Sequence, residues 1–447
     1  MPRLAWFSPM PPVPSGVASC SAQLVEALGP PYEYEIEVFV DASRTPPPPG
    51  TRSAHDFLWR HRQNPYDLTV YQLGNSSVHN YIWPYLFRYP GLAVLHDGHL
   101  HHARAAQLLH GKRAADYRVE FAANHPAVTA DLAELAVAGF DSHLHYYWPM
   151  RRLIVETSKL TVVHSERLAE ELRDELPGAS IEAIRLGHGR LVTPAEAAAA
   201  RQEVRARRGI PADALVFGVF GGLSPDKRVP QILAAFAATR HQLPASYLLL
   251  AGGIPSHYDP GPQIRQSGLA AHVIATGHLE SEEELTAHIA ASDIAFNLRW
   301  PTAREVSGPW LRCLAAGRPT VIFQLAHLGV LPSLDPRTWR MEAAGGGSNA
   351  RPICVAIDLL DEDHSLRLVM RRLAQDFALR DALGRAARDY WRANHDPALM
   401  IEDYRRVITR ALALPAPRPQ LPPHLLRDAT STLHDVLTAF GVADPLR

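Results

Sequence analysis

Residues 291–317 read ASDIAFNLRWPTAREVSGPWLRCLAAG, and the interpretation of the whole chain starts from them. The apolar segment 294–298 is typical of a short buried strand, and a polar loop follows it. Ser307-Gly308 then opens a helix, Pro309 suits a position at or near its first residue, and Gly317 suits its end. The stretch is therefore predicted as a strand, a loop and a capped helix.

The loop and the helix start have the features of an anion site. Backbone N–H groups at Ser307 and Gly308 would point out of the helix N-terminus, where the helix dipole also favours negative charge. Because Gly308 has no side chain, an anion such as a diphosphate can approach the backbone closely. Arg299, Arg304 and Glu305 crowd the preceding loop. The alternative is an ordinary strand, loop and helix with a capped start.

Outside this stretch, strand and helix patterns alternate in two series, which predicts two doubly wound α/β domains, each with a parallel Rossmann-like sheet. The first series has apolar strand segments at 3–8, 35–40, 66–73, 91–95, 160–163 and 181–186. The second has them at 216–220, 247–252, 273–277, 294–298 and 320–323. Two such domains facing across a cleft would form a natural two-substrate site.

Helical patterns connect these strands and extend beyond them. We expect helices at 19–28, 81–87, 151–158, 166–176, 229–239, 282–292, 363–393 and 397–412, and a helix-like excursion at 100–144. Pro84 is awkward inside one of them. The resulting boundaries are an N-terminal domain at 1–190, a linker helix at 191–213, a C-terminal domain at 214–395, a crossover helix at 396–412, and a Pro-rich segment with a terminal helix (430–440) at 413–447.

The composition favours a soluble globular protein with a substantial core, because 47% of the 447 residues are hydrophobic and 20% are charged. The net charge is −1 and no polybasic arm is present, so nothing supports a nucleic-acid partner. Cys20, Cys313 and Cys354 lie far apart, which fits a reducing compartment and argues against a disulfide framework or a zinc site. With no signal-like segment and no run of 18 apolar residues, we expect a cytoplasmic protein.

Two features of the first series follow predicted strands, at the edge where open α/β sheets bind ligands. The Ser15-Gly16 turn can present backbone N–H groups to a phosphate or sugar, or it can be a plain turn. It lacks the Gly-x-Gly-x-x-Gly fingerprint of dinucleotide binding. His96-Asp97 suits a polar contact, an acid/base or a transition-state stabiliser, or alternatively a helix cap. The neighbouring His99, His101 and His102 lack the spacing of a zinc-binding helix, so no metal site is expected.

The second series carries a Gly-rich loop after its first strand. Gly221-Gly222 is followed by Lys227, and backbone N–H groups with one lysine suit a nucleotide diphosphate. A Gly-Gly turn near a lysine also occurs without any such function. The loop alone therefore does not predict a nucleotide site, and the interpretation depends on the neighbouring segments.

Taken together, these segments resemble family 4 of the retaining glycosyltransferases, which have the two-domain GT-B fold. The resemblance covers roughly residues 3–410. In the second series the matching segments, in order, are Phe220–Lys227 (FGGLSPDK), Leu248–Gly252 (LLLAG), Val273–Gly277, Ser292–Ile294 (SDI) and Glu305–Gly317. In the first series they are Gly16, His96-Asp97, Val163–Ser165 and Leu186-Gly187. No single motif is decisive, but the ordered set is.

The resemblance implies roles for individual residues. Lys227 would contact the donor diphosphate, Glu305 the donor sugar, and His96 the sugar and acceptor side. The implied catalytic residues are His96, Asp97 and Glu305. The implied donor-binding residues are Gly16, Gly221, Gly222, Lys227, Arg228, Gly277, Arg304, Val306, Ser307 and Gly308, and no metal ligand is implied.

Two positions depart from the family pattern. Gly222 stands where the family usually has an arginine, so one diphosphate cation is missing, and Arg228, Arg299 or Arg304 are the candidates to replace it. Arg312 stands where a second glutamate is expected, which leaves the ribose contact usually assigned to that glutamate without its residue. The Glu-x-Ser-Gly form at Glu305 resembles a bacterial subgroup, so activity is still expected.

The function implied is transfer of a hexosyl unit, with retention, from a UDP- or GDP-sugar to a hydroxyl of a carbohydrate or lipid-linked acceptor. Neither a metal nor an obligatory cofactor is implied, because helix N-termini and cations can stabilise the departing diphosphate. A lipid-linked acceptor would bring the protein to the inner face of the membrane as a peripheral partner. The alternatives are a sugar phosphorylase or nucleotide-sugar epimerase on the same fold, or a non-catalytic nucleotide-sugar-binding protein. The sequence leaves the oligomeric state open.

Overall fold

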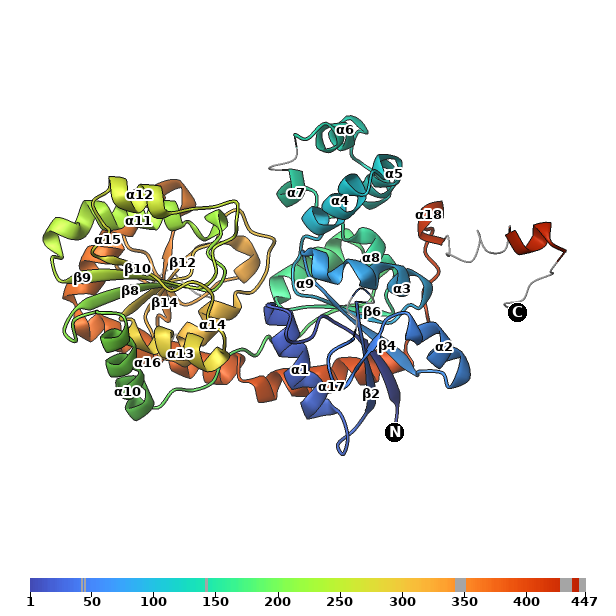
Figure 1. Cartoon of the computed structure of the whole chain (residues 1–447), viewed down its shortest axis with the longest axis horizontal. Helices are drawn as coiled ribbons and strands as arrows, with labels where there is room; N and C mark the ends of the chain where they lie inside the picture. The colour runs from blue at the N-terminus through green and yellow to red at the C-terminus, as the bar shows by residue number, and fades with distance from the viewer. Residues whose placement is uncertain (42, 44–45, 141–143, 342–350, 427–435, 442–447) are drawn as a thin grey trace. The chain divides into compact units, whose positions relative to one another are not determined.

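The computed structural model describes residues 1–41, 43, 46–140, 144–341, 351–426 and 436–441. The chain forms two compact units (Figure 1). The first comprises Met1–Val163, Leu168–Ala183 and Tyr404–Arg447, and the second comprises His164–Arg167 and Ile184–Asp403. The helix expected as a linker, α10 (Pro194–Arg207), therefore lies within the second unit.

The first unit is built on a parallel sheet with the strand order β3-β2-β1-β4-β5-β6-β7. Its strands are β1 (Arg3–Phe7), β2 (Glu35–Val40), β3 (Thr51–Ser53), β4 (Leu68–Leu73), β5 (Leu92–Leu95), β6 (Leu160–Val163) and β7 (Ile181–Ala183). The central strands β4, β5 and β6 are buried along their whole length. Burial along the whole length of a strand is expected where helices cover both faces of a parallel sheet. The predicted strand 181–186 is shorter than expected, and the edge strand β3 was not predicted.

Helices connect these strands in the order that the sequence indicates. They are α1 (Gly16–Leu28), α2 (Asp56–Gln63), the 3₁₀ turn η1 (Ser77–Ile82), α3 (Trp83–Arg88), α8 (Arg152–Thr157) and α9 (Glu166–Glu175). Pro84 is the second residue of α3, where its missing N–H has no intrahelical partner to lose. The proline that was awkward inside a helix at 81–87 thus helps to start a shorter one.

The excursion predicted at 100–144 forms a small helical cluster of its own, drawn in teal in Figure 1. It consists of α4 (His101–His110), α5 (Ala114–Asn124), α6 (Asp131–Val137) and α7 (Leu144–Tyr147). Tyr117, Phe121 and Met150 are buried at its centre, apart from the main core of the unit. The excursion therefore has its own apolar core.

The second unit repeats the design with the strand order β10-β9-β8-β11-β12-β14-β13, again parallel. Its strands are β8 (Leu215–Phe220), β9 (Ser246–Ala251), β10 (Val273–Ala275), β11 (Ile294–Phe296), β12 (Thr320–Phe323), β13 (Ser333–Leu334) and β14 (Cys354–Ile357). The last two strands were not predicted. Two parallel, helix-covered sheets confirm the predicted α/β class.

The helices of this unit are α10, α11 (Val229–Thr239), α12 (Gly261–Gln266), α13 (Glu282–Ala291), α14 (Gly308–Ala315), α15 (Glu362–Gln375) and α16 (Phe377–Asn394), with 3₁₀ turns η2 (Pro225–Lys227), η3 (Arg240–Gln242), η4 (Ala326–Leu328) and η5 (Leu359–Asp361). The single helix predicted at 363–393 is wrong. Asp376 separates α15 from α16, because its carboxylate accepts a hydrogen bond from the Leu379 N–H at 2.9 Å and caps the second helix.

The stretch 291–317 forms β11, a loop and α14, as predicted. Asp293 fixes its start, since its carboxylate accepts the Val216 N–H of β8 at 2.8 Å and pairs with Arg201 and Arg205 of α10 at 2.7 and 2.9 Å. Ser307 caps α14 by accepting the Trp310 N–H at 3.4 Å. Gly317 follows the helix end at φ +65°, a conformation that favours glycine.

The last long helix, α17 (Pro397–Ala413), starts in the second unit and ends in the first. Beyond it the chain continues to α18 (Pro423–Leu426), where Leu421 and Leu425 pack against the core of the first unit. Most of the terminal helix predicted at 430–440 falls on residues 430–435, outside the described residues. No helix in the described part of the chain is both long and apolar enough to cross a bilayer.

Candidate functional site

Most of the predicted donor-binding residues gather at one edge of the second unit's sheet. The loop after β8 carries Gly221 and Lys227, and the loop after β11 carries Glu305 and leads into α14. Because β8 and β11 are neighbours and parallel, both loops emerge at the same edge. The fold thus brings together two segments that lie about 80 residues apart in sequence.

Lys227 is the buried cation of this edge, with 6% of the residue exposed. Its Nζ donates a hydrogen bond to the Phe220 carbonyl at the end of β8. Burial, and then the nearby Arg299 guanidinium, lower the pKa of Lys227 to about 7. The amine is therefore poised to gain a proton, and an anion bound beside it would favour the charged form.

Gly221 makes room for this lysine. It has φ +85°, and a Cβ at this position would lie 3.0 Å from both Lys227 Nζ and Pro309 Cγ. The Gly-rich loop, the lysine amine and the first turn of α14 are therefore in close contact. The second glycine, Gly222, has open space on its side-chain face, with nothing within 4 Å of where a Cβ would stand.

Glu305 is held by two partners. Arg299 Nε lies 2.7 Å from Glu305 Oε1, and the Thr302 hydroxyl donates to Oε2 at 2.9 Å. Arg299 also pairs with Asp226 at 3.3 Å. The carboxylate therefore has a fixed orientation at the wall of a small cavity of about 30 Å³, which Asn297, Ser307 and His327 also line.

Two further side chains at this cavity were missed at the sequence level. The Asn297 Nδ2 atom is buried and has no hydrogen-bond partner. Burial lowers the pKa of His327, against the opposing effects of the Glu305 charge and of a hydrogen bond to the Glu305 backbone. Asn297 follows β11 directly, so its position at a strand end was the available signal. His327 belongs to a 3₁₀ turn that no local motif indicated.

The N-terminus of α14 has a second set of neighbours. A Cβ on Gly308 would lie 3.3 Å from Arg312 Nη1 and 3.4 Å from His188 Cδ2. Burial, followed by the Arg312 charge, lowers the pKa of His188 to about 3, so this imidazole is neutral at ordinary pH. His188 stands in a Gly-His-Gly turn after the last predicted strand of the first series, and the sequence offered no stronger signal for it.

Other predicted donor-site residues are placed differently. Arg228 turns to α15, where its Nε lies 2.8 Å from Glu362 Oε1. Arg304 has φ +61° and donates its N–H to the Thr302 hydroxyl at 3.0 Å. Gly277 follows β10 and forms an antiparallel bridge with Gly252. Val306 lies in the loop between Glu305 and the cap of α14.

The predicted residues of the first unit lie at the corresponding edge of its own sheet. His96 follows β5, and its Nε2 lies 2.7 Å from Gln72 Oε1. Asp97 Oδ2 accepts the Asn75 N–H at 2.6 Å and thereby fixes the turn after β4. Gly16 is the first residue of α1, capped by Ser15, with nothing within 4 Å of a Cβ position.

The histidines beside His96 serve the helical excursion. His101 is buried, its Nε2 lies 2.8 Å from the Tyr117 hydroxyl, and burial together with His145 lowers its pKa to about 2. Over the residues that the structure describes, no group of three or more His, Cys, Asp or Glu side chains could hold a metal ion.

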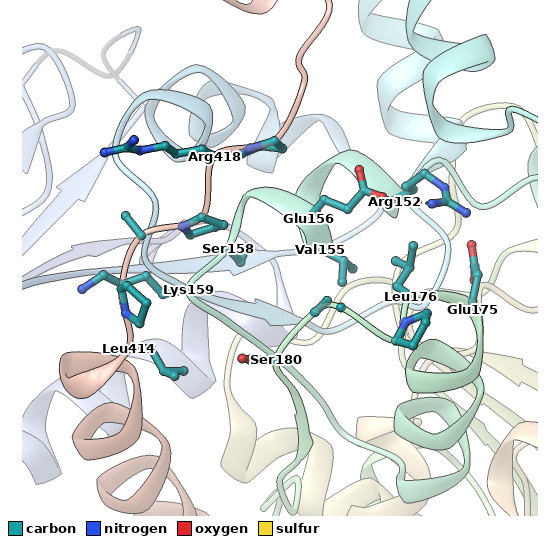
Figure 2. A pocket seen from close by; sticks show the side chains of 17 residues that line it. Arg152, Val155, Glu156, Ser158, Lys159, Glu175, Leu176, Ser180, Leu414 and Arg418 are labelled. Atoms are coloured by element: carbon teal, nitrogen blue, oxygen red, sulfur yellow. Dashed lines mark hydrogen bonds and ion pairs between the residues drawn. The ribbon is translucent and has the colours of Figure 1, made fainter.

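A cavity of about 540 Å³ lies elsewhere in the first unit (Figure 2). The turns before β6 and β7 and the Pro-rich segment 414–419 line it. Val155, Leu176 and Leu414 contribute apolar surface, whereas the Lys159 and Arg418 side chains extend to one side. Because it is at the amino ends of these strands, it is on the opposite edge of the sheet from His96.

Comparison with known proteins extends the fold assignment. No family model matches the chain, and no curated protein matches its sequence significantly. Among solved structures, sucrose-phosphate synthase from Thermosynechococcus elongatus has a TM-score of 0.64 at 16% identity, over 92% of this chain and 100% of its own. The catalytic domain of starch synthase IV from Arabidopsis thaliana, bound to ADP and acarbose, has a TM-score of 0.59 at 12% identity, over 92% of this chain and 99% of its own.

A third neighbour is Anabaena HepE in complex with UDP, with a TM-score of 0.55 at 14% identity, over 92% of this chain and 100% of its own. The fold of the chain is thus that of the GT-B glycosyltransferases: two Rossmann-like units, each with a parallel sheet. At these identities, the likeness establishes the fold.

Proposed function

We propose that this chain is a retaining glycosyltransferase of the family 4 type. It would move a hexosyl unit from a nucleoside diphosphate sugar, a UDP- or GDP-sugar, to a hydroxyl of a carbohydrate or lipid-linked acceptor. The observation that carries the proposal is the grouping of a buried lysine, the N-terminus of α14 and the braced Glu305 at one sheet edge. The complexes of HepE with UDP and of starch synthase IV with ADP support a nucleotide-linked donor.

The geometry suits the departure of a diphosphate. Negative charge grows on the leaving phosphate as the bond to the sugar breaks, and Lys227 and the first turn of α14 lie where they would stabilise it. Because the bound anion raises the lysine pKa above about 7, Lys227 would be charged in the complex. These groups give the proposed transfer its metal-independent character.

Glu305 would hold the donor sugar. Its two oxygens are oriented by Arg299 and Thr302, so the carboxylate meets the sugar hydroxyls without first having to become ordered. His96 would lie on the sugar and acceptor side, with its ring orientation fixed by Gln72. Asp97 would act on this side as a positioning residue, through the turn at Asn75.

A ligand screen followed by a transfer assay tests the proposal. The full-length protein is heated with UDP, GDP, ADP and their glucose and mannose conjugates, and a donor present at 100 times its Kd should stabilise it by about 2.7 kcal/mol. The stabilising donor is then incubated with a panel of sugar and lipid-linked acceptors. Bacterial inner-membrane vesicles serve as one source of lipid-linked acceptors.

Lys227→Ala and Glu305→Ala should each lower transfer at least about 100-fold. Arg392→Gln, which removes an exposed ion pair with Asp389 in the same unit, is the matched control and should transfer normally. Full transfer by both site variants would refute the site. Consumption of a sugar together with inorganic phosphate would instead identify a phosphorylase.

A further inference from the structure

A charge arrangement at the start of α14 is unusual for a helix. Arg312 lies in the second turn and is 8% exposed, and its guanidinium reaches back to the first turn, where a Cβ on Gly308 would lie 3.3 Å from Nη1. Side chains of a helix do lean toward its N-terminus. A cation at that end is nevertheless unfavourable, because it faces the positive end of the helix dipole.

Arg312 has little freedom to leave this place. Gly189 packs against its stem so closely that a Cβ there would lie 3.1 Å from both Cα and Cγ of Arg312. The guanidinium pairs with the carboxylate of Glu282 in the first turn of α13, whose side chain is 44% exposed. The Arg312 Nε atom is buried and has no hydrogen-bond partner. A buried cation is thus incompletely satisfied beside a helix N-terminus.

The same helix start borders a second cation. Gly221 connects the two, because a Cβ there would touch Lys227 Nζ and Pro309 Cγ, each at 3.0 Å, and Pro309 is the neighbour of Gly308. Lys227 Nζ and Arg312 Nη1 therefore both lie close to the first turn of α14. The other carboxylates of this edge, Glu305 and Asp226, already share Arg299, so among the described residues it is Glu282 that pairs with Arg312.

We propose that Arg312 is the second cation for the donor diphosphate, acting from α14 in place of the cation that the Gly-rich loop lacks at Gly222. Glu282 is then its counter-ion in the free protein, and the arriving diphosphate takes over part of that pairing. This inference rests on the proposed nucleotide-sugar site. It implies that Arg312 strengthens binding of the nucleoside diphosphate, whereas Glu282 weakens it.

Two variants separate this role from a structural brace. Arg312→Gln should weaken binding of UDP or GDP, whichever stabilises the native protein, by roughly 10- to 100-fold, since it removes charge-assisted hydrogen bonds. Glu282→Gln should tighten the same binding by roughly two- to fivefold, since it removes a half-exposed counter-ion. A brace would predict the same direction for both, because each variant breaks the same ion pair.

Isothermal titration calorimetry with UDP, UMP and uridine, or with the guanosine series, measures the effect. The loss in Arg312→Gln should be larger for the diphosphate than for the monophosphate, and absent for the nucleoside. Arg388→Gln is the matched control, because Arg388 reaches the Ala316 carbonyl at the other end of α14 and should affect stability only. Circular dichroism establishes that each variant is folded.

The possible failures are distinguishable. If the native protein binds no nucleoside diphosphate, the proposed function fails and this inference fails with it. If the native protein binds one and Arg312→Gln binds it equally well, only the role of Arg312 is refuted. Equal losses in Arg312→Gln and Glu282→Gln would also refute it, in favour of a brace between α13 and α14.

Discussion

Lys227→Met should make the protein more stable below pH 7 while it removes donor binding. The lysine amine is buried, and its pKa is about 7 in the folded chain, against 10.5 for an ordinary lysine. That difference corresponds to a cost of about 5 kcal/mol for carrying the charged amine in the folded state. The folded state bears the full cost below pH 7, where the amine is charged. Methionine has a similar shape and no charge, so it avoids this cost.

The net gain is smaller than the full cost, because the hydrogen bond from Nζ to the Phe220 carbonyl is also lost. Leaving that carbonyl unsatisfied costs about 1–3 kcal/mol, so we expect a gain of at least about 2 kcal/mol at pH 6. For a domain of 150–250 residues, this is a rise of about 4–8 °C in the unfolding temperature.

The pH dependence gives the prediction its sign. Between pH 7 and 10.5 the unfolded chain holds a proton that the folded chain has released, so the stability of the native protein rises with pH in this window. The advantage of Lys227→Met should therefore be full at pH 6 and shrink toward pH 10. Thermal unfolding of both proteins at paired pH values, followed by tryptophan fluorescence, measures it. A variant less stable than the native protein at pH 6, or a difference independent of pH, would refute the reasoning.

Three further outcomes follow from single contacts. Gly308→Ala should change the free energy of unfolding by less than about 1 kcal/mol and should bind UDP or GDP more weakly in calorimetry. Gly221→Ala, at φ +85°, should lower the free energy of unfolding, measured in urea, by about 1 kcal/mol or more. Asp293→Ala should destabilise the second unit by about 3–5 kcal/mol in the same assay, because two buried or half-buried arginines lose their carboxylate. His424→Ala should destabilise the first unit by about 1 kcal/mol and lower its unfolding temperature, because Glu120 loses a hydrogen bond of 2.7 Å. His424→Gln should restore part of this stability. Equal unfolding temperatures for the native protein and both variants would contradict the role of His424.

Local sequence patterns predicted the regular elements well where burial and propensity agree. The strands β2, β6 and β12 and the helix α11 begin and end at the predicted residues. β6 and β12 are short, fully buried segments, and α11 is an apolar-rich helix of 11 residues that follows the Gly-rich loop. The strands β3 and β13 have three and two residues, too few to show any period.

The break at Asp376 shows a limit of the same reasoning. Residues 363–393 contain no proline, and their one glycine, Gly384, lies within α16 and not at the break. The break comes from one aspartate whose side chain caps the next helix, and aspartate is also common on helix surfaces. Only the direction of that side chain distinguishes the two uses.

The candidate site divides in the same way. The residues of the Gly-rich loop and of the capped helix start were recognisable because their chemistry lies in adjacent residues, as with Ser307 and Gly308. The partners of the cations were not recognisable. Glu362, which pairs with Arg228, is 134 residues away, and Glu282, which pairs with Arg312, is 30 residues away.

The sequence by itself determined that two series of parallel strands would form and that a capped helix would start at Ser307-Gly308, because apolar periodicity and capping act over a few residues. The tertiary structure decided which carboxylate pairs with each arginine near that helix start. Arg228, Arg299 and Arg312 have the same guanidinium charge, and each could satisfy a phosphate. Their roles differ because packing places a different carboxylate beside each one, and no local pattern specifies that neighbour.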